Sequence, residues 1–79
     1  MKVQVFGMGC ASCKILLENA QAAVKESGVN AEVIKVDDMI EIIESGILAT
    51  PGLAIDGKVK SMGRVPRKEE IIDWIKENR

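Results

Sequence analysis

Cys10 and Cys13 are the residues of this 79-residue chain whose type and spacing point to redox chemistry. They form a Cys-x-x-Cys pair, in which two nearby thiols can close a disulfide or hold a metal ion. The chain contains no histidine, so imidazole cannot act here as a base, an acid or a ligand. We therefore expect any chemistry of this chain to centre on the dithiol.

The composition is that of an ordinary globular domain with almost no net charge. Eleven basic residues face twelve acidic ones, the formal net charge is −1, and 47% of the residues are hydrophobic. This balance argues against disorder and gives no electrostatic basis for a nucleic-acid partner. No apolar run could span a bilayer, and no apolar segment typical of a signal peptide follows Lys2. We therefore expect a cytoplasmic monomer without a membrane partner, formed by a single domain over residues 1–79.

The hydrophobic pattern predicts seven elements that position the two cysteines. Alternating apolar residues closed by glycines predict strands, and apolar residues at helical spacing predict helices. Asp56-Gly57 predicts a tight hairpin, Asp37-Asp38 supplies an N-cap, and Pro66 suits the first turn of a last helix. The predicted strands are 2–6, 31–36, 52–55 and 58–62, and the predicted helices are 11–27, 39–46 and one whose inner side carries Ile71, Ile72, Trp74 and Ile75.

The resulting order, β-α-β-α-β-β-α, predicts an α/β fold with a four-stranded mixed sheet and helices on its faces. The first strand–helix–strand unit requires a parallel pair with a right-handed crossover, and the hairpin adds antiparallel strands. In this topology the first strand ends, and the third begins, near Cys10. Arg64 follows the fourth strand at the same edge. It would either favour a thiolate or an anionic partner there, or belong to a solvated basic face.

The start of a helix predicts different roles for the two sulfurs. The free N–H groups and the positive end of the helix dipole stabilise a thiolate, which lowers the pKa of Cys10. No Asp or Glu precedes Glu18, and the side-chain charges before it are those of Lys2 and Lys14. Cys13 lies one turn further and is expected to be more buried. We therefore expect Cys10 to attack a substrate disulfide and Cys13 to resolve the mixed disulfide.

A Cu(I) site is the main alternative for the same cysteines. The segment Gly7-Met8-Gly9-Cys10-Ala11-Ser12-Cys13 resembles the metal-binding loop of heavy-metal-associated domains and copper chaperones. Met8, Cys10 and Cys13 would be the ligands, because thiolates suit the soft Cu(I) ion. That family has the order βαββαβ and ends in a strand, whereas a closing helix is predicted here. Further alternatives are a pair of buried structural thiols and a zinc site completed by a second subunit.

Thr50-Pro51 favours a redox function over copper binding. Together with the Cys-x-x-Cys motif it resembles the thioredoxin superfamily, in which a Thr-cisPro or similar loop faces the redox cysteines. The resemblance covers nearly the whole chain. It is closest to the small glutaredoxin- or thioredoxin-like group called redox-active disulfide proteins. Two further segments carry it, namely Thr50-Pro51-Gly52-Leu53-Ala54-Ile55-Asp56-Gly57 and Gly63-Arg64-Val65-Pro66.

The resemblance implies a minimal thioredoxin-like fold and a thiol–disulfide oxidoreductase that needs no cofactor. It implies a disulfide-containing protein or small molecule as substrate and a disulfide reductase as electron donor. A cis bond before Pro51 would expose the backbone of Thr50 to a substrate strand, whereas a trans proline would merely start the third strand. Ala11-Ser12 replaces the Gly-Pro of thioredoxins and the Pro-Tyr of glutaredoxins. No Tyr lies near the motif, which argues against glutathione binding.

Overall fold

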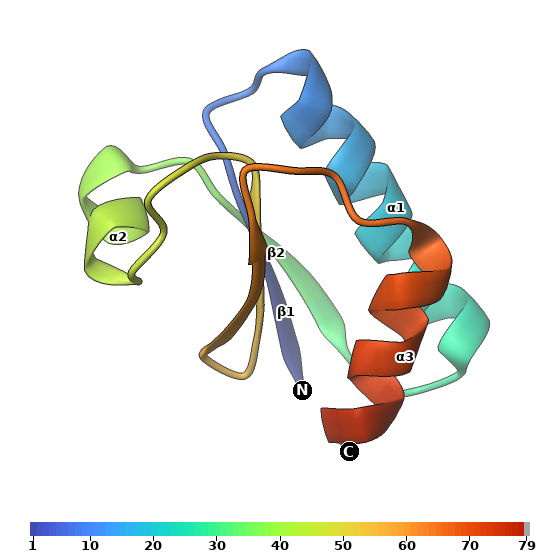
Figure 1. Cartoon of the computed structure of the whole chain (residues 1–79). Helices are drawn as coiled ribbons and strands as arrows, with labels where there is room; N and C mark the ends of the chain where they lie inside the picture. The colour runs from blue at the N-terminus through green and yellow to red at the C-terminus, as the bar shows by residue number, and fades with distance from the viewer. Residues whose placement is uncertain (79) are drawn as a thin grey trace.

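The fold is a four-stranded sheet with helices on both of its faces (Figure 1). The structure, a computed structural model, describes residues 1–78. The predicted order β-α-β-α-β-β-α and the mixed sheet are confirmed. Within the described residues no helix is both long and apolar enough to cross a membrane. In chain order the elements are β1 (Lys2–Phe6), α1 (Ala11–Ser27), β2 (Glu32–Val36), α2 (Met39–Glu44), β3 (Gly52–Ile55), β4 (Lys58–Met62) and α3 (Lys68–Asn78).

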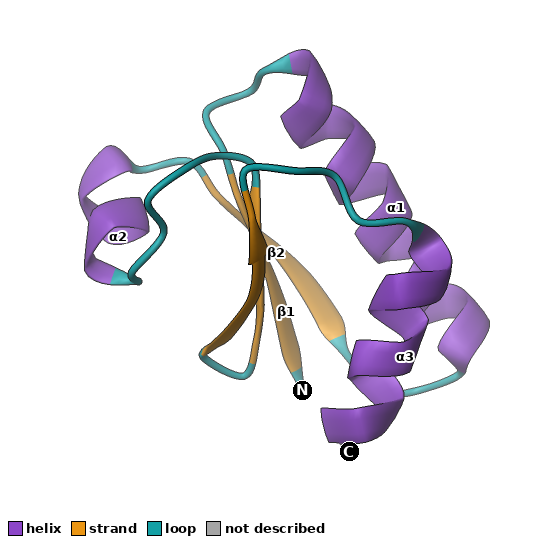
Figure 2. Cartoon of the chain, viewed as in Figure 1, coloured by secondary structure: helices purple, strands orange, loops and turns teal. Residues whose placement is uncertain are grey.

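The sheet has the strand order β2-β1-β3-β4. β1 is parallel to β2 and antiparallel to β3, and β4 is antiparallel to β3. Phe6, the last residue of β1, pairs with Val36 on one side and with Gly52 on the other. Gly52 in turn pairs with Met62, the last residue of β4. The ends of three strands and the start of the fourth therefore meet at one edge, at the top of Figure 2.

Each face of the sheet has its own hydrophobic core. α1 and α3 lie side by side on one face, and α2 lies on the other (Figure 1). Because side chains alternate along a strand, Val3 and Val5 of β1 face α1 and α3, whereas Phe6 belongs to the core on the α2 side. The first core consists of Val3, Val5, Leu16, Ala20, Ala23, Leu53, Ile55, Ile71 and Ile75, and the second of Phe6, Val36, Ile42, Ile47 and Ala54.

Local signals set most of the element boundaries. α1 ends at Gly28, whose φ of 72° is the left-handed conformation that glycine adopts without strain. The Asp38 carboxylate caps α2 by accepting hydrogen bonds from the N–H groups of Ile40 and Glu41. Asp56 and Gly57 both have positive φ and form the predicted hairpin turn.

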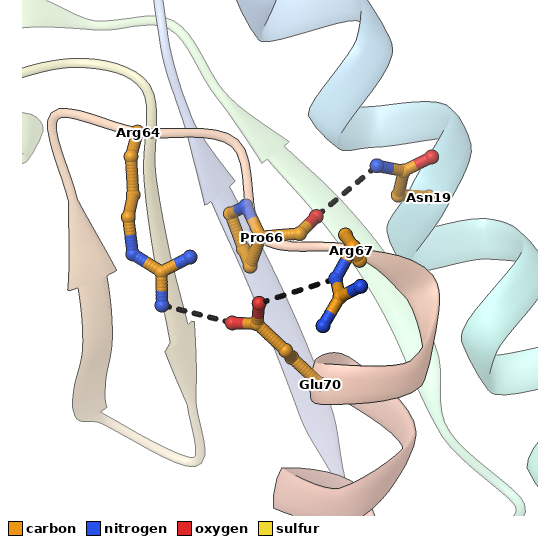
Figure 3. A network of polar contacts seen from close by, with 5 residues as sticks. All are labelled: Asn19, Arg64, Pro66, Arg67 and Glu70. Atoms are coloured by element: carbon orange, nitrogen blue, oxygen red, sulfur yellow. Dashed lines mark hydrogen bonds and ion pairs between the residues drawn. The ribbon is translucent and has the colours of Figure 1, made fainter.

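Two predicted helix boundaries are wrong by a few residues. Pro66 is not in the first turn of α3. α3 begins at Lys68. Arg67 directly precedes the helix, and its carbonyl accepts a hydrogen bond from the N–H of Ile71. Pro66 lies one residue before Arg67 and is therefore outside the helix. Pro66 is buried, and its carbonyl accepts a hydrogen bond of 3.1 Å from the Asn19 side chain of α1 (Figure 3). α2 ends at Glu44, not at residue 46, and a turn through Gly46 follows it.

Ser61 on β4 provides a test of core energetics. Its side chain is 8% exposed, and its Oγ has no hydrogen-bond partner within residues 1–78. Because a buried unpaired hydroxyl costs about 1–3 kcal/mol, we expect Ser61→Ala to raise the free energy of unfolding by about 1 kcal/mol in urea denaturation. Ser27→Ala is the control and is expected to lower the free energy of unfolding. The Ser27 hydroxyl donates a hydrogen bond to the carbonyl of Val24 and accepts one from the N–H of Val29. A destabilising Ser61→Ala would contradict the prediction.

Candidate active site at the Cys10–Cys13 pair

Cys10 and Cys13 form a disulfide at the start of α1, and their Cα atoms are 5.0 Å apart. Cys10 is the N-cap residue of the helix, in extended conformation. Its Sγ accepts a hydrogen bond of 3.2 Å from the backbone N–H of Cys13. The position predicted for Cys10, next to the free N–H groups of a helix N-terminus, is confirmed.

The two sulfurs differ in their access to solvent, as predicted. Cys10 is exposed, whereas Cys13 is 5% exposed. Cys13 packs against the backbone of Gly7, directly after β1. A Cβ built on Gly7 would lie 2.8 Å from the Cβ of Cys13 and would also collide with its Sγ. In the sequence, Gly7 indicates only the end of a strand, and no pattern of residues points to this contact.

The Thr50–Pro51 peptide bond is cis, as the resemblance implied, and the alternative of a trans proline is wrong. Pro51 is buried and Thr50 is exposed. The Pro51 carbonyl accepts a hydrogen bond of 2.9 Å from the N–H of Gly63, which ties this loop to the end of β4. Because Gly52 pairs with Phe6, the loop lies at the same sheet edge as the segment that leads to Cys10 (Figure 2). A role of Thr50 and Pro51 in substrate binding stays a prediction.

Arg64 is engaged by α3, as Figure 3 shows. Its Nη2 lies 2.9 Å from Oε2 of Glu70, and its guanidinium lies 6.0 Å from the centroid of the Trp74 ring. The hydrogen bond from Arg64, together with its charge, holds the pKa of the Glu70 carboxyl below its ordinary value, and Arg67 adds a longer ion pair of 3.7 Å. The positive charge of Arg64 is therefore matched by a carboxylate. Its proposed contact with substrate stays a prediction.

A small pocket lies beside Cys13, between residues of β1, α1 and β2. Its volume is about 250 Å³ including its open mouth. Two of its walls are the lysine side chains of α1 and β2, Lys14 and Lys35. Lys14 was considered from the sequence, whereas Lys35 was not singled out within the predicted strand 31–36. The complete lining is Val5, Gly7, Gly9, Cys13, Lys14, Leu17 and Lys35.

The structure does not have the chain order of the copper-binding family. Its last described element is the helix α3, whereas that family ends in a strand. Met8, the third proposed ligand, is 60% exposed. Within residues 1–78, no group of three or more His, Cys, Asp or Glu side chains is placed to hold a metal ion.

Comparison with known proteins identifies the family of this chain. The family model described as a thioredoxin domain matches residues 1–76. The chain belongs to the thioredoxin family. A thioredoxin from Methanothermobacter thermautotrophicus is 55% identical over 71 residues, which cover 90% of this chain and 92% of that protein. A thioredoxin from Methanocaldococcus jannaschii is 40% identical over 74 residues, covering 94% and 85%, respectively.

Membership of the thioredoxin family confirms the main predictions from the sequence. The fold is the minimal thioredoxin-like arrangement, and the chain is a thiol–disulfide oxidoreductase. The Cys10–Cys13 disulfide supports this activity, and the catalytic roles of the two cysteines stay a prediction. The narrower likeness to glutaredoxins stays a prediction, because these relatives are named thioredoxins.

Proposed function

We propose that this protein reduces disulfide bonds in protein or small-molecule partners, and that a separate disulfide reductase recharges it. The observation that carries the proposal is the asymmetry of the pair. Cys10 is exposed and its Sγ accepts a helix N–H, whereas Cys13 is buried one turn further along α1. In such an arrangement a large partner meets the exposed sulfur first. The buried sulfur then resolves the mixed disulfide.

The reaction consists of two exchange steps. The Cys10 thiolate attacks one sulfur of the substrate disulfide, whose S–S bond breaks, and the released sulfur takes up a proton. A mixed disulfide now joins Cys10 to the substrate. The Cys13 thiolate then attacks Sγ of Cys10, the Cys10–Cys13 bond forms, and the second substrate sulfur leaves as a thiolate and is protonated. Two electrons have passed from the dithiol to the substrate.

The sheet edge around the pair supports the docking of an extended substrate segment. Thr50 is exposed, and Pro51 directly precedes β3. Because Gly52 pairs with Phe6, both residues lie at the end of the sheet where the loop to Cys10 begins. A substrate strand could hydrogen-bond the Thr50 backbone while its disulfide meets Cys10. Arg64 would act at the rim of such a site only after exchanging its partner Glu70 for an anionic substrate. We further propose that the protein acts as a monomer in the cytoplasm.

Reduction of insulin in the presence of dithiothreitol tests the proposal. We expect catalytic amounts of the protein to bring forward the precipitation of the insulin B chain relative to dithiothreitol alone, because the helix N–H groups around Cys10 stabilise its reactive thiolate. The matched control is the Cys10→Ser/Cys13→Ser double variant, which retains the surface but lacks both sulfurs. Equal precipitation times with protein and with control would refute disulfide reduction as the function.

A further inference from the structure

α2 leaves most of its apolar side chains in contact with solvent. Four of its six residues are apolar, but only Ile42 is buried, in the core beneath the helix. Met39, Ile40 and Ile43 are 56%, 68% and 65% exposed. Residues three and four apart are neighbours on a helix surface, so these three side chains form one outward face. Leu48, in the loop after the helix, is 90% exposed. Packing against the sheet therefore does not account for these four side chains.

The charged residues around these side chains are all acidic. Asp37 and Asp38 precede the helix, Glu41 and Glu44 belong to it, and all four are exposed. No Lys or Arg occurs over residues 36–57. Within residues 1–78, none of the four carboxylates forms an ion pair. We call this surface the α2 face, and it consists of Asp37, Asp38, Met39, Ile40, Glu41, Ile43, Glu44 and Leu48.

The α2 face is close to the exchange site but separate from it. Val36, the last residue of β2, pairs with Phe6, and α2 begins three residues later. After Leu48 the chain returns to Thr50 and Pro51 at the same end of the sheet. The helix itself lies on the opposite side of the sheet from α1, which begins directly after Cys10 (Figure 1). A protein that docks on α2 is thus held beside the sheet edge where disulfides are exchanged.

The charge of the α2 face determines which occupant fits it. A symmetric dimer through this face would place the same surface of both copies together, so four carboxylates would oppose four others. Like charges that face each other across an interface lower affinity. Lys and Arg around a complementary apolar surface would instead pair with these acids. Apolar patches with a polar border are typical of protein interfaces.

We infer that the α2 face docks a partner protein of the exchange reaction whose own surface is apolar and bordered by Lys and Arg. The inference rests on the proposed function and names the kind of partner that it serves. The exposed apolar side chains supply contact area, and the acids select partners by charge and speed their approach. The chemistry of disulfide exchange at Cys10 is unchanged.

Two synthetic helical peptides without cysteine test this preference. Both carry leucines along one side, and the flanking positions are lysines in one peptide and glutamates in the other. Each is labelled with a fluorophore and titrated with the disulfide-closed protein, and binding is followed by fluorescence anisotropy. We expect the lysine peptide to bind at least about tenfold more tightly, with a smaller difference at high salt. Amide NMR signals should shift for residues 37–49 when this peptide is added.

Two double variants address the charges and the apolar side chains of the α2 face separately. Glu41→Lys/Glu44→Lys is expected to reverse the preference between the peptides. Ile40→Ser/Ile43→Ser is expected to weaken binding of the lysine peptide about tenfold. Asp73→Lys/Glu77→Lys is the matched control, because it reverses two exposed carboxylates on α3, and it should leave the preference unchanged. Circular dichroism checks that each variant is folded.

The inference is wrong if both peptides bind equally well, if the α3 control changes the preference as much as the α2 variant, or if the NMR shifts lie outside residues 37–49. It is also wrong if sedimentation shows that the wild type dimerises and that Ile40→Ser/Ile43→Ser is monomeric, because a second copy would then cover the α2 face. Peptide binding requires no disulfide exchange. A failure of the insulin assay and a failure of this test are therefore separate results.

Discussion

Replacing Cys13 with serine is expected to convert the protein from a catalyst into a covalent trap for its substrates. Cys10 remains exposed at the helix N-terminus and still attacks a disulfide, but the buried sulfur that completes the reaction is gone. We expect insulin reduction to fall on the order of a thousandfold, as for the loss of a nucleophile that acts within a catalytic unit. A mixed disulfide between Cys10 and the insulin chain should accumulate, visible by mass spectrometry without reducing agent.

Cys10→Ser is the matched control, because it removes the other sulfur of the same disulfide. Its activity should fall as far, but no adduct should form, since the remaining Cys13 is 5% exposed and does not meet a protein partner directly. The opposite pattern, an adduct in Cys10→Ser and none in Cys13→Ser, would show that the two cysteines have exchanged roles. Adducts in neither variant would contradict a mixed-disulfide mechanism.

The elements that the sequence predicted well are those whose signals are local. The helix 11–27 and the strands 2–6, 52–55 and 58–62 have the predicted bounds, because glycines and the Asp56-Gly57 turn set their ends within a few residues. The signal that places Cys10 directly before a helix is also local. It allows the prediction that Cys10 is exposed and that Cys13 is more buried. Thr50-Pro51 was recognised through a resemblance and not through any pattern of hydrophobicity.

Features that depend on packing between distant segments could not be predicted in the same way. Arg64 forms an ion pair with Glu70 on α3. This pairing depends on the path of the loop between β4 and α3, which a hydrophobic pattern does not predict. Pro66 lies before the helix, and its carbonyl accepts a hydrogen bond from the Asn19 side chain of α1, a contact between segments 47 positions apart. Lys35 reaches the pocket beside Cys13 because of the register between β1 and β2. A pattern of polar and apolar residues gives the face of a strand but not the side chain that lies opposite.

Gly7→Ala is expected to be strongly destabilising, although alanine is the smallest possible addition. The new methyl group would lie 2.8 Å from Cβ of Cys13 and would overlap its Sγ. The backbone has little freedom to yield, because the N–H of Gly7 donates a 3.0 Å hydrogen bond to the carbonyl of Val36. Cys13 cannot move alone either, since it belongs to α1 and is bonded to Cys10. Overpacking of this kind costs about 1–3 kcal/mol, and we expect a loss in this range in urea unfolding.

Gly52→Ala is the matched control, because Gly52 lies at the same sheet edge and pairs with Phe6, the residue before Gly7. A Cβ on Gly52 would also be crowded, at 2.9 Å from Cδ1 and 3.1 Å from Cγ2 of Ile47, but these atoms belong to a side chain that no covalent bond holds in place. A small shift of the Ile47 side chain relieves part of the contact, so a loss smaller than that of Gly7→Ala, about 1 kcal/mol, is expected. Equal losses for both variants would mean that Cys13 adjusts as easily as Ile47. A larger loss for Gly7→Ala, reduced when Cys13→Ala removes the overlapping sulfur, would show that the glycine is required by the active-site cysteine itself.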